Sequence, residues 1–275
     1  MVNFTKTKEY LICVDSDGTV MDSMLIKHER ALAPKVISVF GLEDHEEEIL
    51  KKWYEVNLYK ETRGLNRFIA LDSILEFVKN FGYKYDGYDA FHEWVLTTDS
   101  LSIDSLKKEI AKKGNKECLC KALEWGLEVN DEIKKLPFSK PFTNAKKSIE
   151  ILSSVTDLLG VSSANYDAIT TEWHHAQIDT YFKAIACQKD GTKENIIANA
   201  LSLGYDPKNV LMLGDSIGDL IAAKKNNIHF FPFIPKYEND SWNELIDKAL
   251  PRFLDNKFDD NYQNDLIDRF KRVLS

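Results

Sequence analysis

Short apolar runs and amphipathic segments alternate over the second half of the chain. The apolar runs predict buried strands at 157–161, 182–187, 209–214 and 228–232. The amphipathic segments predict helices at 166–177, 193–203 and 218–225, with further helices after Ser241 and Asn261. Strands that alternate with helices are typical of a parallel, doubly wound sheet with helices on both faces.

The first half of the chain has a different pattern. One apolar run, Tyr10–Val14, predicts a buried strand. From about residue 20 to residue 140 the apolar spacing is helical nearly throughout. It predicts helices at 24–40, 46–58, 66–80, 89–95 and 117–133, and a helix start at 104–107. We therefore expect an α/β domain of residues 1–19 and 141–275, with a helical domain of residues 20–140 inserted after its first strand.

The composition narrows the class of protein. The chain has 275 residues, of which 44% are hydrophobic and 29% are charged, as in ordinary globular proteins. The net charge of −8 argues against a general nucleic-acid-binding protein. No apolar run approaches the ~20 residues of a membrane span, the first residues lack an apolar signal segment, and the four cysteines are scattered. We therefore expect a cytoplasmic monomer or homodimer without nucleic-acid or membrane partners.

Two of the predicted strands end in paired acidic residues. The first strand is followed by Asp15 and Asp17, and the strand at 209–214 is followed by Asp215 and Asp219. In an open α/β sheet, ligands bind at the carboxyl ends of the strands. Four carboxylates in one pocket cannot all stay ionised unless a positive charge compensates them. A hard divalent cation that binds oxygen ligands is the simplest source of that charge.

These residues resemble the haloacid dehalogenase superfamily. The motifs that carry the resemblance are, in chain order, Asp15–Thr19, Ser162, Lys193 and Gly214–Asp219. The helical insertion stands where this family has its type 1 cap, and the most similar members look like phosphoglycolate phosphatases and β-phosphoglucomutases. The resemblance implies a Rossmann-like core and Mg²⁺-dependent hydrolysis of a small phosphorylated metabolite.

The resemblance also implies a role for each acidic or basic motif residue. Asp15 would be the nucleophile that forms an aspartyl-phosphate, and Asp17 would be the general acid and then the base. Mg²⁺ would be held by Asp15, by the backbone carbonyl of Asp17 and by Asp215. Lys193 would offset the charge that develops during transfer. Asp219 would hold Lys193 or a metal-bound water.

The phosphate group itself would be bound by hydroxyl and backbone N–H groups. Ser162 would hold phosphate oxygens, and Gly18, Thr19 and Ser163 would add contacts around it. Ser163 is also the nearest substitute for Ser162. Lys189 is the alternative to Lys193, which begins the next helix, as the lysine of the site.

Two of the six arginines lie at a break in the helical pattern of the inserted domain. Arg63 and Arg67 flank Gly64, which predicts a turn between two helices. An arginine at such a turn could bind a carboxylate or a second phosphate of the substrate. Alternatively, both could be surface residues that pair with neighbours such as Glu61.

Other activities remain open from the sequence. A phosphomutase would share Asp15 and Asp17 and would differ chiefly in excluding water. Dehalogenases and phosphonate hydrolases of the superfamily lack the second aspartate, so Asp17 favours phosphate chemistry. Gly214–Gly218 also matches the nucleophile elbow of serine hydrolases, with Ser216 as nucleophile, but His229 is the only later histidine.

Overall fold

The computed structural model describes residues 3–60 and 62–275, which form two compact units. The α/β unit comprises the described residues up to Met24 together with Phe138–Ser275, and the helical unit comprises Leu25–Pro137. The divisions thus fall after Met24 and Pro137, whereas the sequence predicted them after residues 19 and 140.

Backbone hydrogen bonds explain why residues 20–24 belong to the α/β unit. The N–H of Asp22 donates to the carbonyl of Lys140, and the N–H of Phe142 donates to the carbonyl of Val20, both at 2.9 Å. The chain therefore leaves and re-enters the α/β unit through two segments that are hydrogen-bonded to each other.

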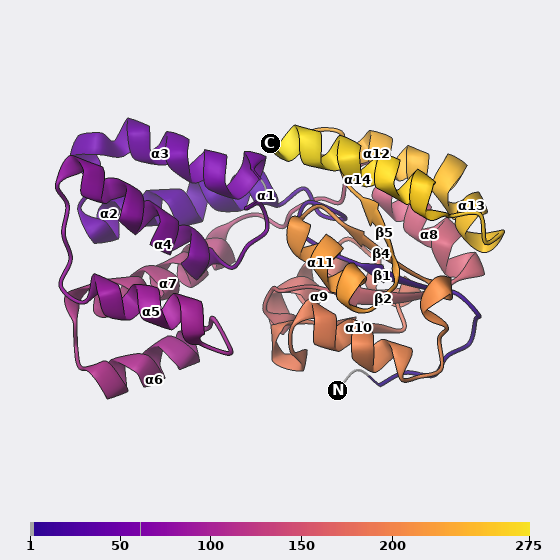
Figure 1. The fold of residues 1–275 in the computed structure, drawn as a ribbon, viewed down its shortest axis with the longest axis horizontal. Coiled ribbons are helices and arrows are strands. Elements are labelled where there is room, and N and C mark those ends of the chain that lie inside the picture. The colour runs from indigo at the N-terminus through magenta and orange to yellow at the C-terminus, as the bar shows by residue number, and fades with distance from the viewer. Residues whose placement is uncertain (1–2, 61) are drawn as a thin grey trace. The chain divides into compact units, whose positions relative to one another are not determined.

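A five-stranded parallel sheet forms the centre of the α/β unit (Figure 1). Its strands are β1 (Leu11–Val14), β2 (Asp157–Val161), β3 (Ala184–Ala186), β4 (Val210–Gly214) and β5 (His229–Pro232). The spatial order is β3-β2-β1-β4-β5, and every pair is parallel. The predicted doubly wound fold is confirmed. The strand order reverses between β1 and β4, and that switch point is where ligands bind in such sheets.

The sheet is buried on both faces because its side chains alternate between two apolar clusters. In β1, Ile12 and Val14 belong to one cluster, and Leu11 and Cys13 belong to the other. The first cluster takes residues from α8 (Ala145–Val155), α9 (Tyr166–His175), α12 (Glu238–Glu244) and α13 (Leu250–Leu254). The second takes residues from α10 (Lys193–Leu201), α11 (Ile217–Lys225) and α14 (Asp260–Leu274).

One helix was not predicted from the sequence, and several predicted helices and strands begin or end at other residues in the structure. Helix α8, which precedes β2, was not predicted, although Ala145, Ile149 and Leu152 have helical spacing and are fully buried. Strand β3 has three residues where the sequence predicted six. The helix predicted to start at 104–107 begins at Ile103, because the Ser102 side chain accepts the N–H of Ser105 as its N-cap.

The helical unit follows β1 and its loop. Its helices are α1 (Met24–Lys27), α2 (Ala33–Phe40), α3 (Glu46–Tyr54), α4 (Arg67–Val78), α5 (Tyr88–Thr97), α6 (Ile103–Lys113) and α7 (Glu117–Lys135). Between α1 and α2 the helix widens into a π-turn next to Pro34, which has no N–H for the preceding turn. Aromatic rings fill the core: Trp125 meets Trp53 and Phe68 edge to face, at 6.1 and 5.8 Å between ring centres.

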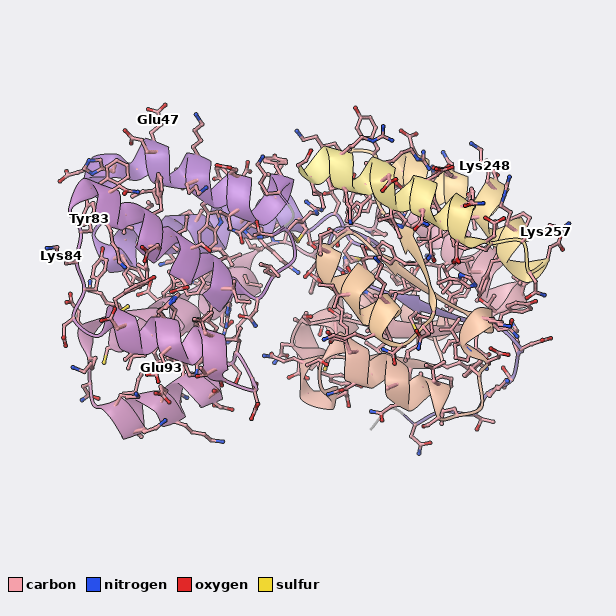
Figure 2. All side chains as sticks on the ribbon, in the orientation of Figure 1. Glu47, Tyr83, Lys84, Glu93, Lys248 and Lys257 are labelled. Atoms are coloured by element: carbon pink, nitrogen blue, oxygen red, sulfur yellow. The ribbon has the colours of Figure 1, made fainter. Side chains whose placement is uncertain are left out.

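Charged side chains extend from both units into solvent, as Figure 2 shows for Glu47, Lys84 and Lys248. Within the described part of the chain, no helix has both the length and the apolar character that crossing a bilayer requires.

Candidate active site

The carboxyl ends of β1 and β4 bring the two acidic motifs together. The N–H of Asp15 donates to the carbonyl of Leu213 at 3.0 Å, which continues the pairing of the two strands by one residue. Carboxylate oxygens of Asp15, Asp215 and Asp219 lie within 4.8 Å of one another, and all three residues are buried. This carboxylate cluster lies at the switch point of the sheet.

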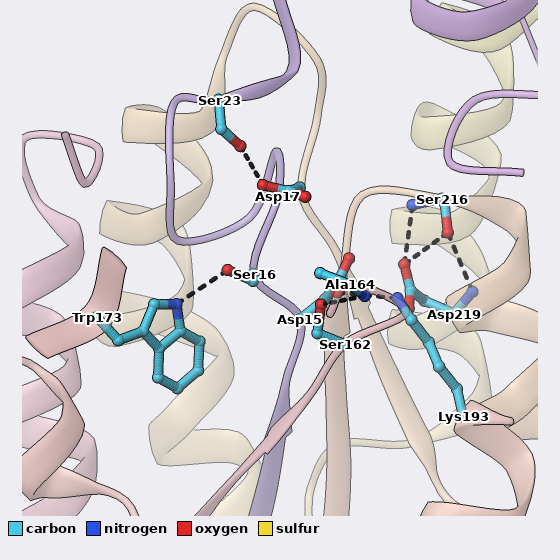
Figure 3. A network of polar contacts seen from close by, with 10 residues as sticks. All are labelled: Asp15, Ser16, Asp17, Ser23, Ser162, Ala164, Trp173, Lys193, Ser216 and Asp219. Atoms are coloured by element: carbon cyan, nitrogen blue, oxygen red, sulfur yellow. Dashed lines mark hydrogen bonds and ion pairs between the residues drawn. The ribbon is translucent and has the colours of Figure 1, made fainter. Parts of the chain in front are cut away.

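Lys193 joins two of these carboxylates (Figure 3). Its Nζ lies 2.9 Å from Asp15 Oδ1 and 2.6 Å from Asp219 Oδ1. Lys193 is the first residue of α10, whose N-cap is Thr192. The other candidate, Lys189, lies over the ring of Tyr166, 3.2 Å from its centre.

Asp219 is also fixed from its own helix. Its Oδ2 accepts hydrogen bonds from the Ser216 N–H at 3.2 Å and from the Ser216 hydroxyl at 2.6 Å. The Asp219 N–H donates in turn to the Ser216 hydroxyl oxygen at 3.2 Å, which completes a capping box at the start of α11. A Cβ on Gly214 would lie only 2.3–2.4 Å from the side-chain atoms of Asp219. A glycine at the end of β4 therefore leaves the space that this carboxylate occupies.

The electrostatics of the cluster follow from its burial. Burial raises the pKa of Asp15 well above its ordinary value; Lys193 opposes this shift, while Asp219 and Asp215 add to it. Burial alone would lower the pKa of Lys193, but Asp15 and Asp219 outweigh it and hold that pKa above its ordinary value. The lysine therefore stays charged, while Asp215 and Asp219 disfavour the ionised form of Asp15.

Asp17 lies on the same loop as Asp15 but has a different partner. The hydroxyl of buried Ser23 donates to Asp17 Oδ1. The loop between them is tight: Gly18 has φ +76°, and the carbonyl of Ser16 accepts N–H groups from residues 19, 20 and 21. Figure 3 shows Asp15 directed toward Lys193 and Asp17 directed toward Ser23.

The residues predicted to bind phosphate have partners of their own. Ser162 is buried after β2, and its Oγ accepts the Ala164 N–H at 3.1 Å, while Ser163 is exposed. The N–H groups of Gly18 and Thr19 donate to carbonyls within their own loop, to Met21 and Ser16 respectively. The Thr19 hydroxyl is buried, and no hydrogen-bond partner for it is found among the described residues.

Arg63 and Arg67, the two arginines at the predicted turn, make contacts inside the helical unit. Arg63 is buried and donates from Nη1 to the carbonyl of Leu58 at 3.0 Å. Arg67 donates to Asn130 Oδ1 at 2.8 Å and lies 5.4 Å from the centre of the Phe68 ring. The pairing with Glu61 that the sequence suggested lies outside the described residues.

The geometry does not assemble a serine triad. The hydroxyl of Ser216 bonds Asp219. His229 begins β5 opposite Leu211, while Ser216 lies two residues beyond the end of β4. Parallel strands rise by about 3.3 Å per residue, so the histidine and the serine belong to opposite ends of the sheet.

Several residues that support the acidic motifs were not identified in that role from the sequence. Ser23 donates a hydrogen bond to Asp17, and Trp173 donates one to Ser16 within the acidic loop. Only the structure reveals these contacts, because they depend on the folded loop. Ser216 carried a signal that could have been used: a serine three residues before an acid at a helix start is the pattern of a capping box.

A family comparison adds an independent observation. A model described as haloacid dehalogenase-like hydrolase matches residues 69–232, more than half of the chain. The chain belongs to this hydrolase family. The matched segment contains Ser162, Lys193, Asp215 and Asp219, while the loop with Asp15 precedes it. Among curated proteins no sequence matches.

Solved structures with the same fold include two named for phosphoglycolate phosphatase. A predicted phosphoglycolate phosphatase from Haemophilus somnus has a TM-score of 0.52 and 17% identity, covering 88% of this chain and 99% of that one. A candidate phosphoglycolate phosphatase from Lactobacillus delbrueckii subsp. bulgaricus has a TM-score of 0.51 and 13% identity, covering 82% and 86%. A candidate β-phosphoglucomutase from Thermotoga maritima has a TM-score of 0.44 and 14% identity, covering 81% and 84%.

Proposed function

We propose that this hydrolase is a Mg²⁺-dependent phosphatase that acts on a small phosphorylated metabolite through an aspartyl-phosphate on Asp15. One observation carries the proposal. A buried carboxylate, Asp15, lies beside the Lys193 ammonium and two further acids, while Asp17 on the same loop is held separately by Ser23. Phosphoryl transfer to a carboxylate needs both a nucleophile and a separate proton donor, and this loop offers two acids with different partners.

The charge and chemistry of the cluster fit a magnesium ion. When all are ionised, the three carboxylates and the ammonium carry a formal net charge of about −2, which a divalent cation would balance. Both oxygens of Asp219 already accept hydrogen bonds. Asp15 and Asp215, with the Asp17 carbonyl, would therefore hold Mg²⁺, and Asp219 would support Lys193. Bound there, the ion would offset the negative charge of the phosphate.

Asp15 would act first, in the transfer of the phosphoryl group. One of its carboxylate oxygens forms a bond to phosphorus while the bond from phosphorus to the leaving-group oxygen breaks. Asp17 gives its proton to that oxygen, and Lys193 offsets the charge that develops on the transferred group. The Ser162 hydroxyl, at the end of the neighbouring strand, would orient the phosphate.

Asp17 would act again in the second step. As a carboxylate, it takes a proton from the water that attacks phosphorus, and the bond between phosphorus and Asp15 breaks to release inorganic phosphate. The same side chain thus serves as acid and as base, and each cycle restores its proton.

A screen of small phosphorylated metabolites with Mg²⁺ tests the proposal. Phosphoglycolate belongs in the screen because two structural relatives carry that name. Phosphate release should fall by at least about 10³-fold in Asp15→Asn and Asp15→Ala. Near-wild-type turnover in both variants, with folding intact by circular dichroism, would contradict the proposed nucleophile.

A further inference from the structure

Tryptophans of the α/β unit converge on the loop that carries the two catalytic acids. The chain has five tryptophans, of which Trp173 and Trp242 lie in this unit. Both are fully buried, and both donate their indole N–H to the segment between β1 and the helical unit.

Trp173 reaches the residue between the two aspartates. Its Nε1 donates to the hydroxyl oxygen of Ser16 at 2.9 Å, across 157 positions of sequence (Figure 3). The indole itself is fixed by packing: a Cβ on Gly160 would lie 2.9 Å from its ring atoms, and the Phe182 ring centre is 4.4 Å away. Asp15 and Asp17 flank Ser16, so a fixed Ser16 constrains where both carboxylates point.

Trp242 holds the same loop nearer its middle. Its Nε1, on α12, donates to the carbonyl of Thr19 at 3.0 Å. The Phe233 ring packs against it with ring centres 4.7 Å apart. The tight loop 15–21 is therefore bonded by one buried indole near its start and by another at its middle.

We propose that Trp173 and Trp242 are positioning residues, which hold the loop so that Asp15 and Asp17 face the substrate in the geometry that transfer requires. The role in catalysis rests on the proposed phosphatase function. A buried indole N–H has a strong preference for its acceptor, because leaving it unbonded is costly. Misplacing reacting groups by about 1 Å costs on the order of 10²-fold in rate, so small loop movements are enough to matter.

The experiment combines kinetics with hydrogen exchange. Trp173→Phe and Ser16→Ala each remove the bond between these residues, and Trp242→Phe removes the bond to Thr19. Each change should lower kcat for p-nitrophenyl phosphate by about 10-fold while KM changes less than about 2-fold, because positioning affects the transition state more than binding. Amide exchange in residues 15–21, where several N–H groups are bonded within the loop, should become faster.

A matched control separates positioning from general destabilisation. Trp94 in the helical unit also donates its indole N–H to a serine hydroxyl, Ser105 Oγ, at 3.1 Å. Trp94→Phe should reduce stability comparably but leave kcat and exchange in residues 15–21 unchanged. The double variant Ser16→Ala/Trp173→Phe should lose no more kcat than either single variant, because both remove the same bond.

The outcomes are distinguishable. Equal losses of kcat in Trp94→Phe, or additive losses in the double variant, would overturn the positioning role. If the wild-type protein releases no phosphate from any substrate, the proposed function fails. Loop exchange then still decides whether the tryptophans hold the loop: faster exchange in Trp173→Phe and Trp242→Phe supports the inference, and unchanged exchange overturns it.

Discussion

Asp15 and Asp17 are two residues apart, yet their side chains have different partners. Asp15 is buried beside Lys193, and Asp17 accepts a hydrogen bond from Ser23. The proposed proton transfer from Asp17 predicts a dependence on the leaving group. Asp17→Asn should slow hydrolysis of an alkyl phosphate by about 10²–10⁴-fold and that of an activated aryl phosphate much less. Single-turnover rates for both substrates measure this, with exposed Asp22→Asn as the control.

Equal losses for the two kinds of leaving group in the Asp17 variant would instead mean that this residue is only structural. A normal rate in Asp22→Asn would show that the loss of a nearby acidic side chain does not by itself slow the reaction.

Asp215 and Asp219 have different roles in the proposed metal site. Asp219 bonds both Lys193 and Ser216, so we expect it to act through those partners. Asp215→Ala should weaken Mg²⁺ binding strongly, while Asp219→Ala should weaken it by no more than about 10–100-fold. Calorimetric titration with Mg²⁺ measures both, and exposed Asp206→Ala is the control. Wild-type affinity in Asp215→Ala would contradict the proposed metal site.

At the scale of residues, the acidic motifs could be located in the sequence, but the side chains that hold them in place could not. Asp15, Asp215 and Asp219 could be located because each follows an apolar run that had to be a strand. The sequence could not distinguish Lys193 from Lys189, because Lys193 begins the predicted helix and Lys189 lies just before it. Trp173 carried no signal, because its contact with Ser16 depends on how a distant helix packs.

At the scale of elements, the apolar pattern was sufficient where a strand is buried on both faces. The prediction for β2 matched its bounds, because Asp157–Val161 is buried throughout. Helix α8 was missed although its buried face is regular and Asn144 is a favoured N-cap residue; its three serines have modest helix propensity. Strand β3 is one of the two edge strands, and it pairs with β2 over only three residues.

Asp157, the first residue of β2, ties three segments of the α/β unit together. Its buried carboxylate accepts hydrogen bonds from the Thr7 N–H and hydroxyl, the Lys8 N–H and the Tyr205 hydroxyl, at 2.6–2.9 Å. Asp157→Asn places an amide donor against these donors and should lower the free energy of unfolding by about 3 kcal/mol. Urea denaturation measures the loss, with exposed Asp167→Asn as the control.

The same carboxylate predicts a pH dependence of stability. Burial raises the pKa of Asp157, but the hydrogen bonds from Thr7, Tyr205 and Lys8 outweigh it and leave that pKa below its ordinary value. The stabilisation is therefore fully present above the unfolded pKa of about 3.9 and is lost as pH falls through the folded pKa. The difference between wild type and Asp157→Asn should be constant above about pH 5 and shrink below about pH 4. A difference that grows on acidification would contradict this assignment.

At the scale of the whole molecule, the sequence predicted an insertion because strand patterns stop after one strand and resume about 140 residues later. The α/β core and the helical unit are both present. The divisions were misplaced by three to five residues, since the hydrogen bonds of Val20 and Asp22 cannot be read from periodicity.

The helical unit is the proposed source of substrate specificity. A substrate contact by Arg63 or Arg67 predicts that Arg63→Ala or Arg67→Ala raises KM for the natural substrate and leaves KM for p-nitrophenyl phosphate unchanged. Arg67→Ala should also lower the free energy of unfolding by about 1 kcal/mol, because it loses the bond to Asn130. Asn130→Ala is the matched control for that loss. If KM is unchanged for every substrate in both arginine variants, specificity is determined elsewhere in the unit.

The central claim is that Asp15 carries the phosphoryl group during turnover. Rapid acid quench of the enzyme with substrate and Mg²⁺, followed by peptide mass spectrometry, tests it most directly. We expect one added phosphoryl group on the peptide that contains Asp15. With an activated aryl phosphate, whose leaving group needs little acid, more of it should accumulate in Asp17→Asn, because the water is activated less. No added mass should appear in Asp15→Ala. An active enzyme that shows no modified Asp15 peptide, or one whose phosphoryl group is on another residue, would contradict the account.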